Sequence, residues 1–170
     1  DWVSYAGPDP DAEPYRIPLM ADDPARRTLH QSHMLVRPPQ QDPTRSSRQS
    51  VPTHINEVTS WWDGSQIYGS DEATVDKLRE HRGGRLRLDN DGRLLVDPTT
   101  GLEQVGFSGA WWVGLSFLHT LFVREHNAVC RMLAREYPNW DDQRLYDTSR
   151  QIVAALLAKI HTVEWTPGIL

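Results

Sequence analysis

The chain has 170 residues, of which 38% are hydrophobic and 24% are charged, and this length is sufficient for one domain with its own core. The net charge of −5 implies no basic face for nucleic acid. The apolar runs fall far short of the roughly 20 residues that span a bilayer, although peripheral membrane contact stays open. Cys130 is the single cysteine, so an internal disulfide is excluded and the cytoplasm is the favoured compartment. Because the chain starts at Asp1 and ends just after a helical pattern, we expect an internal stretch of a longer protein.

The first half of the chain is predicted to contain little regular structure. Residues 1–55 are rich in proline and poor in periodic apolar positions, which predicts an extended segment that wraps a larger body, with a flexible linker as the alternative. Residues 56–70 are predicted to form a loop with aromatic anchors. Ser70 is expected to cap a short helix over 71–81. Alternating apolar and polar residues around an Asn-Asp-Gly turn predict a hairpin over 85–96.

The second half is predicted to be helical. Apolar residues recur at intervals near 3.6 over 111–136, which predicts an amphipathic helix. Asp141 or Asp142 is expected to cap a second helix that runs to about Trp165, where a Pro-Gly pair closes it. The central face of this second helix is almost entirely apolar, so we expect deep burial. Strands are minor, and the predicted fold class is therefore mainly α.

Oxygen-bearing groups fall on alternate residues of one loop, at the side chains of Thr59, Asp63 and Ser65 and at the carbonyl of Trp61. Calcium takes about six to eight oxygen ligands, and Gly64 permits the sharp bend that would turn such groups inward. A single carboxylate supplies too little charge for tight binding, so a second, remote carboxylate would be needed. A polar loop held by hydrogen bonds is the simpler alternative from spacing alone.

Two histidines lie two turns apart on the helix predicted over 111–136. His119 and His126 would share roughly one face, which could suggest metal or haem ligands, although ligand pairs on a helix usually sit four residues apart. A buried, hydrogen-bonded histidine is the better interpretation, with Arg124, Glu125 and Asn127 completing a polar network. Cys130 is interpreted as a small core residue.

His161 and Thr166 lie near the end of the last predicted helix. Together they could hold a carboxylate through charge-assisted hydrogen bonds. The alternative is a histidine favoured at a helix C-terminus by the helix dipole. The residues alone leave both open.

Three segments in the same order carry a resemblance to animal haem peroxidases, cyclooxygenases and fatty-acid alpha-dioxygenases. Residues 61–70 (WWDGSQIYGS) resemble their calcium loop, 119–130 (HTLFVREHNAVC) their Arg-Glu-His-Asn helix, and 139–146 (NWDDQRLY) the segment that follows. Residues 159–166 (KIHTVEWT) resemble the alpha-dioxygenases in particular. The match covers roughly residues 53–170, together with Asp1 and Trp2.

The resemblance implies a part of a haem peroxidase-like, all-helical catalytic domain with an extended N-terminal segment and a small hairpin. Within it, residues 1–55 would wrap the body, 56–70 would form the calcium loop and 71–170 the helical core. His161 and Thr166 would bind the substrate carboxylate. Asp1 would supply the missing second carboxylate for calcium, beside Thr59, Trp61, Asp63 and Ser65.

The resemblance also places haem ligation outside this chain. The distal haem histidine would directly precede Asp1, while the proximal histidine and the catalytic tyrosine form a Tyr-x-x-His pattern that this sequence lacks. Residues 106–110 contain no arginine, which argues against a peroxidase of the myeloperoxidase type. We therefore expect no catalytic residue and no haem axial ligand in this chain, and a fragment alone would be inactive.

The resemblance leaves three alternative functions for the protein to which this chain belongs. The first is a fatty-acid alpha-dioxygenase with haem b and calcium, in which a tyrosyl radical removes a hydrogen next to the carboxylate and O₂ adds there. The second is a haem peroxidase that uses H₂O₂ on small organic substrates in a response to oxidative stress. A solvent-facing His161 would favour this second function. The third is a non-catalytic, calcium-stabilised fragment.

Overall fold

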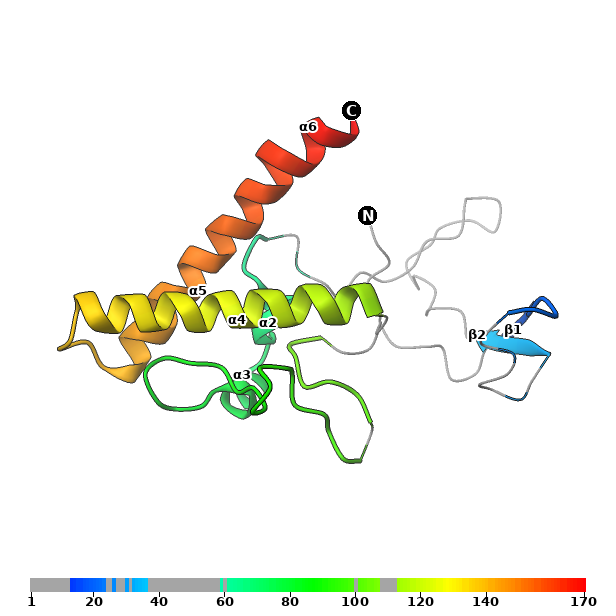
Figure 1. Ribbon diagram of the computed structural model, residues 1–170, viewed down its shortest axis with the longest axis horizontal. Coiled ribbons are helices and arrows are strands. Elements are labelled where there is room, and N and C mark those ends of the chain that lie inside the picture. Colours follow the sequence, from blue (N-terminus) through cyan, green and yellow to red (C-terminus); the bar gives the residue numbers. More distant parts are fainter. Residues whose placement is uncertain are drawn as a thin grey trace, which may run out of the picture. The chain divides into compact units, whose positions relative to one another are not determined.

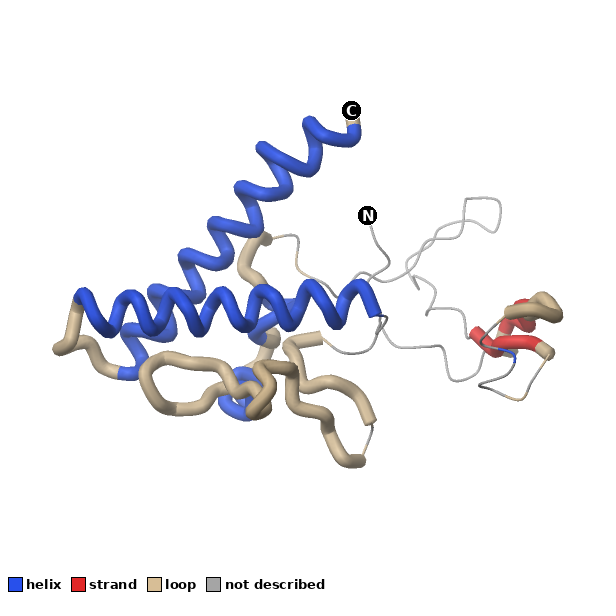
Figure 2. Tube along the Cα trace, in the orientation of Figure 1, coloured by secondary structure: helices blue, strands red, loops and turns tan. Residues whose placement is uncertain are grey.

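The computed structural model describes residues 13–23, 26, 30, 32–36, 59, 61–99, 101–107 and 113–170. The chain divides into two compact units, Asp1–Thr59 and Ser60–Leu170. Among the described residues, none of the helices combines the length and the apolar character needed to cross a bilayer. Figure 2 shows that helices dominate the second unit and that the strands belong to the first, so the mainly α class is confirmed.

The first unit contains a small antiparallel hairpin of β1 (Tyr15–Pro18) and β2 (His33–Val36). Tyr15 pairs with Val36 and Pro18 with His33. Beyond the last pair, the Leu19 amide donates to the carbonyl of Ser32 at 3.0 Å. The apolar side chains of this hairpin are largely exposed, so backbone hydrogen bonds hold it rather than a core of its own.

The hairpin predicted over 85–96 is wrong in its pairing. The Asp89 amide donates to the Arg93 carbonyl at 2.9 Å, so the turn itself forms. The flanks, however, make isolated bridges to other segments, Leu86 to Arg79 and Val96 to Glu103. The physical reason is burial, because Leu86 and Leu94 enter the helical core instead of pairing with each other across a free ribbon.

Two short helices begin the second unit, α2 (Ser65–Tyr68) and α3 (Glu72–Leu78). The cap of α3 is Asp71 and not the predicted Ser70. Its carboxylate accepts from both the amide and the hydroxyl of Thr74, at 2.9 and 2.7 Å. Two acceptor oxygens explain why aspartate takes the cap from the neighbouring serine.

The long helices α4 (Val113–Glu136) and α5 (Asp142–Lys159) confirm the prediction for the second half. Of the two predicted caps, Asp141 caps α5 and accepts from the Arg144 amide at 2.7 Å. Asp142 instead bonds the Gly84 amide and the Arg79 guanidinium, both at 2.7 Å. The α5 N-terminus is thereby tied to the segment that follows α3.

The helix beyond α5 does not close at the Pro-Gly pair. It continues as a π-helix, η1 (Ile160–Trp165), and then as α6 (Thr166–Ile169) with proline in its first turn, so α5, η1 and α6 form one continuous rod in Figure 1. The first turn of a helix tolerates proline because amides there lack intrahelical acceptors. Wide π turns are often found at functional sites.

The core of the second unit forms where α4 and α5 cross (Figure 1). Its main cluster is built from α2, the segments after α3, and the facing sides of both long helices: Ile67, Tyr68, Leu78, Leu86, Leu94, Val105, Val123, Tyr146 and Val153. The prediction of deep burial along the second long helix is correct only for its first part. Val163 is exposed, because the rod leaves the crossing point there. Ile152 is 38% exposed although the adjacent Val153 is fully buried, so Ile152 lies on another side of α5 than the core contact.

Candidate functional site

The loop predicted to bind calcium is a bent, hydrogen-bonded turn that leads into α2. Gly64 has a left-handed φ of +69°, and the Asp63 carboxylate accepts from the Ser65 amide at 2.9 Å. Ser65 is buried, whereas the Trp61 side chain is 82% exposed. The bend thus places the Asp63 carboxylate beside the start of α2, where amide groups favour negative charge.

The remaining predicted ligands are less well defined. Thr59 is exposed, and Asp1 lies outside the described residues. The described residues contain no group of three or more acidic, histidine or cysteine side chains that could hold a metal ion. The described loop therefore provides one carboxylate, one buried serine and a sharp bend, which is fewer ligands than a calcium ion takes.

His161 and Thr166 lie together at the π-helical part of the rod. The Thr166 amide and its hydroxyl both donate to the His161 carbonyl, the hydroxyl at 2.7 Å. By accepting these two hydrogen bonds, the carbonyl closes the wide turn that carries the histidine. The imidazole itself is exposed. In this arrangement the Thr166 proton is directed at the backbone, and donation to a bound acid would require the hydroxyl to rotate.

The structure joins these two predicted regions through Trp62. Its indole lies against the His161 imidazole, with ring centroids 4.7 Å apart and planes tilted by 47°. Trp62 is not among the residues predicted from the sequence to bind substrate or metal. The only sequence signal was the Trp-Trp pair in a polar loop, which gives no indication of a partner 99 positions away.

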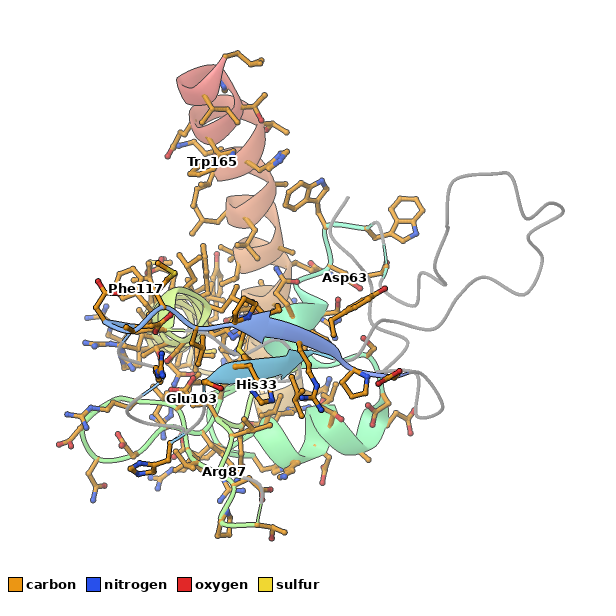
Figure 3. The ribbon with its side chains drawn as sticks, turned by 90° about the vertical axis from the view of Figure 1, so that its right-hand side faces the viewer. His33, Asp63, Arg87, Glu103, Phe117 and Trp165 are labelled. Carbon is orange, nitrogen blue, oxygen red and sulfur yellow. The ribbon has the colours of Figure 1, made fainter. Side chains whose placement is uncertain are left out.

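An open groove of about 610 Å³ runs beside this contact. Trp62 and Asp63 line one side, and the α5 side chains of Arg150, Ala154, Ala155 and Ala158 line the other. Figure 3 labels Asp63 on the loop into α2 and Trp165 farther out on the rod. The lining combines an apolar alanine wall with one guanidinium and two carboxylates, those of Asp63 and Asp147, so it has no excess of positive charge that would select an anionic ligand.

Behind the loop, His126 is the centre of a buried polar cluster. It has no exposed surface, and its Nε2 lies 2.9 Å from the Gly84 carbonyl. Because a carbonyl only accepts, Nε2 carries the proton and Nδ1 accepts from the Tyr68 hydroxyl at 3.0 Å. Cys130, one turn on, lies 3.1 Å from the Ser149 hydroxyl of α5. The buried-histidine interpretation and the core role of Cys130 are confirmed.

The cluster is electrically neutral because of its burial. Desolvation, with a smaller contribution from the Arg79 charge, lowers the pKa of His126 to about 4, against the opposing effect of the hydrogen bond to Gly84. Burial raises the pKa of the Tyr68 phenol above its ordinary value, and it also raises that of the Cys130 thiol. With both ring nitrogens of His126 engaged, this residue cannot bind iron.

The other residues of the predicted network divide between core and surface. His119 is buried, and burial lowers its pKa. Asn127 is also buried and pairs with both backbone groups of Leu86, at 2.8 and 2.9 Å. Arg124 and Glu125 are exposed, so burial is confirmed for the two histidines and Asn127, whereas the predicted network with Arg124 and Glu125 is wrong.

Comparison with known proteins gives a consistent set of relatives. A family model described as animal haem peroxidase matches residues 5–170. Alpha-dioxygenase 2 of Arabidopsis thaliana is 45% identical over 116 residues, covering 68% of this chain and 18% of that protein. Alpha-dioxygenase PIOX of Oryza sativa subsp. japonica is 42% identical over 117 residues, covering 69% and 19%.

Solved structures show the same likeness. A crystal structure of Oryza sativa fatty acid alpha-dioxygenase with palmitic acid superposes with a TM-score of 0.69 at 33% identity, covering 96% of this chain and 26% of that chain. Peroxidase A from Dictyostelium discoideum gives 0.69 at 27% identity, covering 96% and 37%. The chain spans about one fifth of the length of these curated relatives.

Proposed function

Because this chain belongs to the animal haem peroxidase family, we propose that the protein is a haem-dependent oxygenase that adds O₂ to a fatty acid at the carbon next to its carboxylate. The similarity to alpha-dioxygenases supports this choice within the family. This chain would contribute the carboxylate-binding end of the substrate site and the loop that binds calcium.

The observation that carries the proposal is the placement of His161 on a π turn whose carbonyl is fixed by Thr166. An imidazole N–H on an ordered turn can donate a hydrogen bond to a fatty-acid carboxylate, and the charge of the carboxylate strengthens that bond. The Thr166 hydroxyl, after rotation, would donate a second. Two donors would orient the acid so that the carbon next to the carboxylate has a defined position.

Haem is implied by the family, and the described α4 residues do not offer it a ligand. Both nitrogens of His126 are hydrogen-bonded, and His119 is buried in the helix. We therefore propose neither α4 histidine as a haem ligand, and the expectation that the axial ligands lie outside this chain continues to rest on the family resemblance. When bound, haem would supply the oxidising chemistry, and the residues of this chain would bind and orient the substrate.

Calcium is proposed for the bent loop, with a structural role. Asp63 and Ser65 would be ligands, with Thr59, the Trp61 carbonyl and Asp1 completing the set. The bend at Gly64 and the half-buried Asp63 carboxylate support this assignment. Binding would neutralise Asp63 and fix the segment that precedes α2, without taking part in chemistry.

The proposed activity is tested by oxygen consumption. The haem-loaded, full-length protein should consume O₂ when given palmitic acid and release a 2-hydroperoxy acid that mass spectrometry detects. His161→Ala should raise the KM for the acid roughly ten- to hundredfold, the value expected for losing a hydrogen bond to a charged group. No oxygen consumption, together with rapid H₂O₂-dependent oxidation of phenols, would sink the proposal.

A peroxidase acting on small organic substrates with H₂O₂ is the second candidate. Two observations favour it, the exposed imidazole of His161 and the fold shared with Peroxidase A. This exposure refers to the 170 residues of the chain, however, and the matched segment makes up only 18% of Alpha-dioxygenase 2. The same oxygen and phenol assays separate the two candidates, because a peroxidase would leave palmitic acid unchanged without H₂O₂.

A further inference from the structure

The His161 imidazole is the one predicted substrate-binding group that rests against an aromatic side chain from another segment. We propose that Trp62 is a positioning residue, whose indole holds the His161 imidazole in the orientation that receives the substrate carboxylate. The inference rests on the proposed function, since it assumes that a carboxylate binds at His161. It adds a residue from the calcium-loop segment to the substrate site.

The contact geometry supports a holding role. The ring centroids of Trp62 and His161 lie 4.7 Å apart, with a tilt of 47°, within the range in which aromatic rings attract each other. The indole covers part of the imidazole while the residue stays exposed. An imidazole that is restrained on one side and open on another can meet a ligand without first losing its rotational freedom.

The backbone of His161 is restrained independently of its ring. Its carbonyl accepts both the amide and the hydroxyl of Thr166. The next residue, Thr162, donates its hydroxyl to the carbonyl of Ala158, which lies one turn earlier, at 2.7 Å. The π turn is thus fixed from both ends, and the side-chain torsions of His161 remain the freedom that Trp62 limits.

Trp62 is itself held from the following residues. Asp63 accepts from the Ser65 amide at 2.9 Å, and Gly64 turns the chain into α2. Ile67 and Tyr68 of α2 are buried in the main core. The indole therefore extends from a turn whose other end is anchored, so it can restrain His161 instead of following its motion.

A double-mutant cycle on full-length protein tests the inference. The dissociation constant of palmitate is measured by calorimetry without oxygen, so turnover does not enter. Trp62→Ala should weaken palmitate binding about two- to tenfold, in line with an aromatic pair, and Trp62→Phe should restore most of the affinity. His161→Ala alone should weaken binding more. In the His161→Ala background, Trp62→Ala should add nothing, because the imidazole it acts on is gone.

A second readout reports the contact without any ligand. In protein with ¹³C-labelled histidine, the ring current of Trp62 should shift the His161 imidazole signals. Trp62→Ala should remove that shift and Trp62→Phe should keep part of it. Trp165→Phe is the matched control, since Trp165 is an aromatic residue of the same π segment and is 60% exposed. It should change neither the shift nor the palmitate affinity.

The outcomes separate the two ideas. If His161→Ala leaves palmitate affinity unchanged, the carboxylate role fails and the positioning role falls with it. If His161→Ala weakens binding but Trp62→Ala does not, the positioning role alone is refuted. Equal effects of Trp62→Ala in both backgrounds would also refute it, because the indole would then act through something other than His161.

Discussion

Acidification should test the buried state of His126 directly. The residue has no exposed surface and its pKa is lowered to about 4 from an ordinary value of 6.5, mainly by desolvation. Above pH 6.5 the imidazole is neutral in both the folded and the unfolded chain, so it contributes no pH dependence. Between pH 6.5 and about 4 the unfolded chain binds a proton that the folded chain rejects, so stability falls as the pH falls.

The size of the effect follows from the two pKa values. Their difference corresponds to about 3 kcal/mol when fully developed, and to roughly 2.5 kcal/mol at pH 4.5. Protonation would also turn Nδ1 into a donor facing the Tyr68 hydroxyl, which could no longer donate to it. Tyr146 packs against both rings, and the Arg79 charge nearby adds to the cost.

Urea unfolding of the protein and of His126→Gln, at about pH 7 and about pH 4.5, measures this contribution. Carboxylates with lowered pKa, such as Glu80, lose their stabilising effect in both proteins and cancel in the comparison. We expect the destabilisation caused by His126→Gln to shrink by roughly 2.5 kcal/mol on acidification. His81→Gln, which alters an exposed histidine, is the control. Identical pH slopes for wild type and His126→Gln would refute the reasoning, as would an NMR titration midpoint of His126 near 6.5.

Three further perturbations address the packing and the loop. Gly84→Ala should lower the free energy of unfolding in urea by about 3 kcal/mol or more, because φ is +73° and the new Cβ would lie 2.6 Å from a backbone nitrogen. Gly83→Ala, where φ is +64° and no atom lies near the new Cβ, should lower it by only about 1 kcal/mol, and equal losses would contradict the steric argument. Arg79→Met should cost about 2 kcal/mol by leaving Asp142 without its partner at 2.7 Å, and a loss below about 0.5 kcal/mol would count against that ion pair. Asp63→Ala should lower calcium affinity in calorimetry and haem retention in the Soret band together, so haem retention that survives calcium loss would contradict the structural role of the loop.

Sequence periodicity was sufficient to predict the two long helices. The apolar spacing over 111–136 and the aspartates before the second helix are local signals, and α4 and the Asp141 cap follow them closely. The buried state of His126 was also accessible, since a histidine on an apolar helix face is usually a hydrogen-bonded core residue. These features depend on neighbours within a few residues.

The parts that could not be predicted depend on contacts between distant segments. Leu86 had an alternating pattern that suits a hairpin, yet its backbone pairs with Arg79 and with the Asn127 side chain of α4. The π turn at 160–165 has no sequence signature, because the i to i+5 bond depends on how Thr166 meets the His161 carbonyl. The Trp62 contact with His161 likewise requires the fold to bring two segments together.

The buried cluster and the exposed site are mechanically related, because both partners of the Trp62–His161 contact are anchored on one face of α4. His126 and Cys130 lie one turn apart on that face. His126 bonds the Tyr68 hydroxyl of α2, the helix that follows Trp62 after a single bend. Cys130 meets Ser149 of α5, the helix that continues into the turn bearing His161. The relative position of the indole and the imidazole is therefore set by two segments that contact the same helix, residues 62–68 through His126 and residues 149–161 through Cys130. A neutral His126 keeps the hydrogen bond that holds the first of these segments.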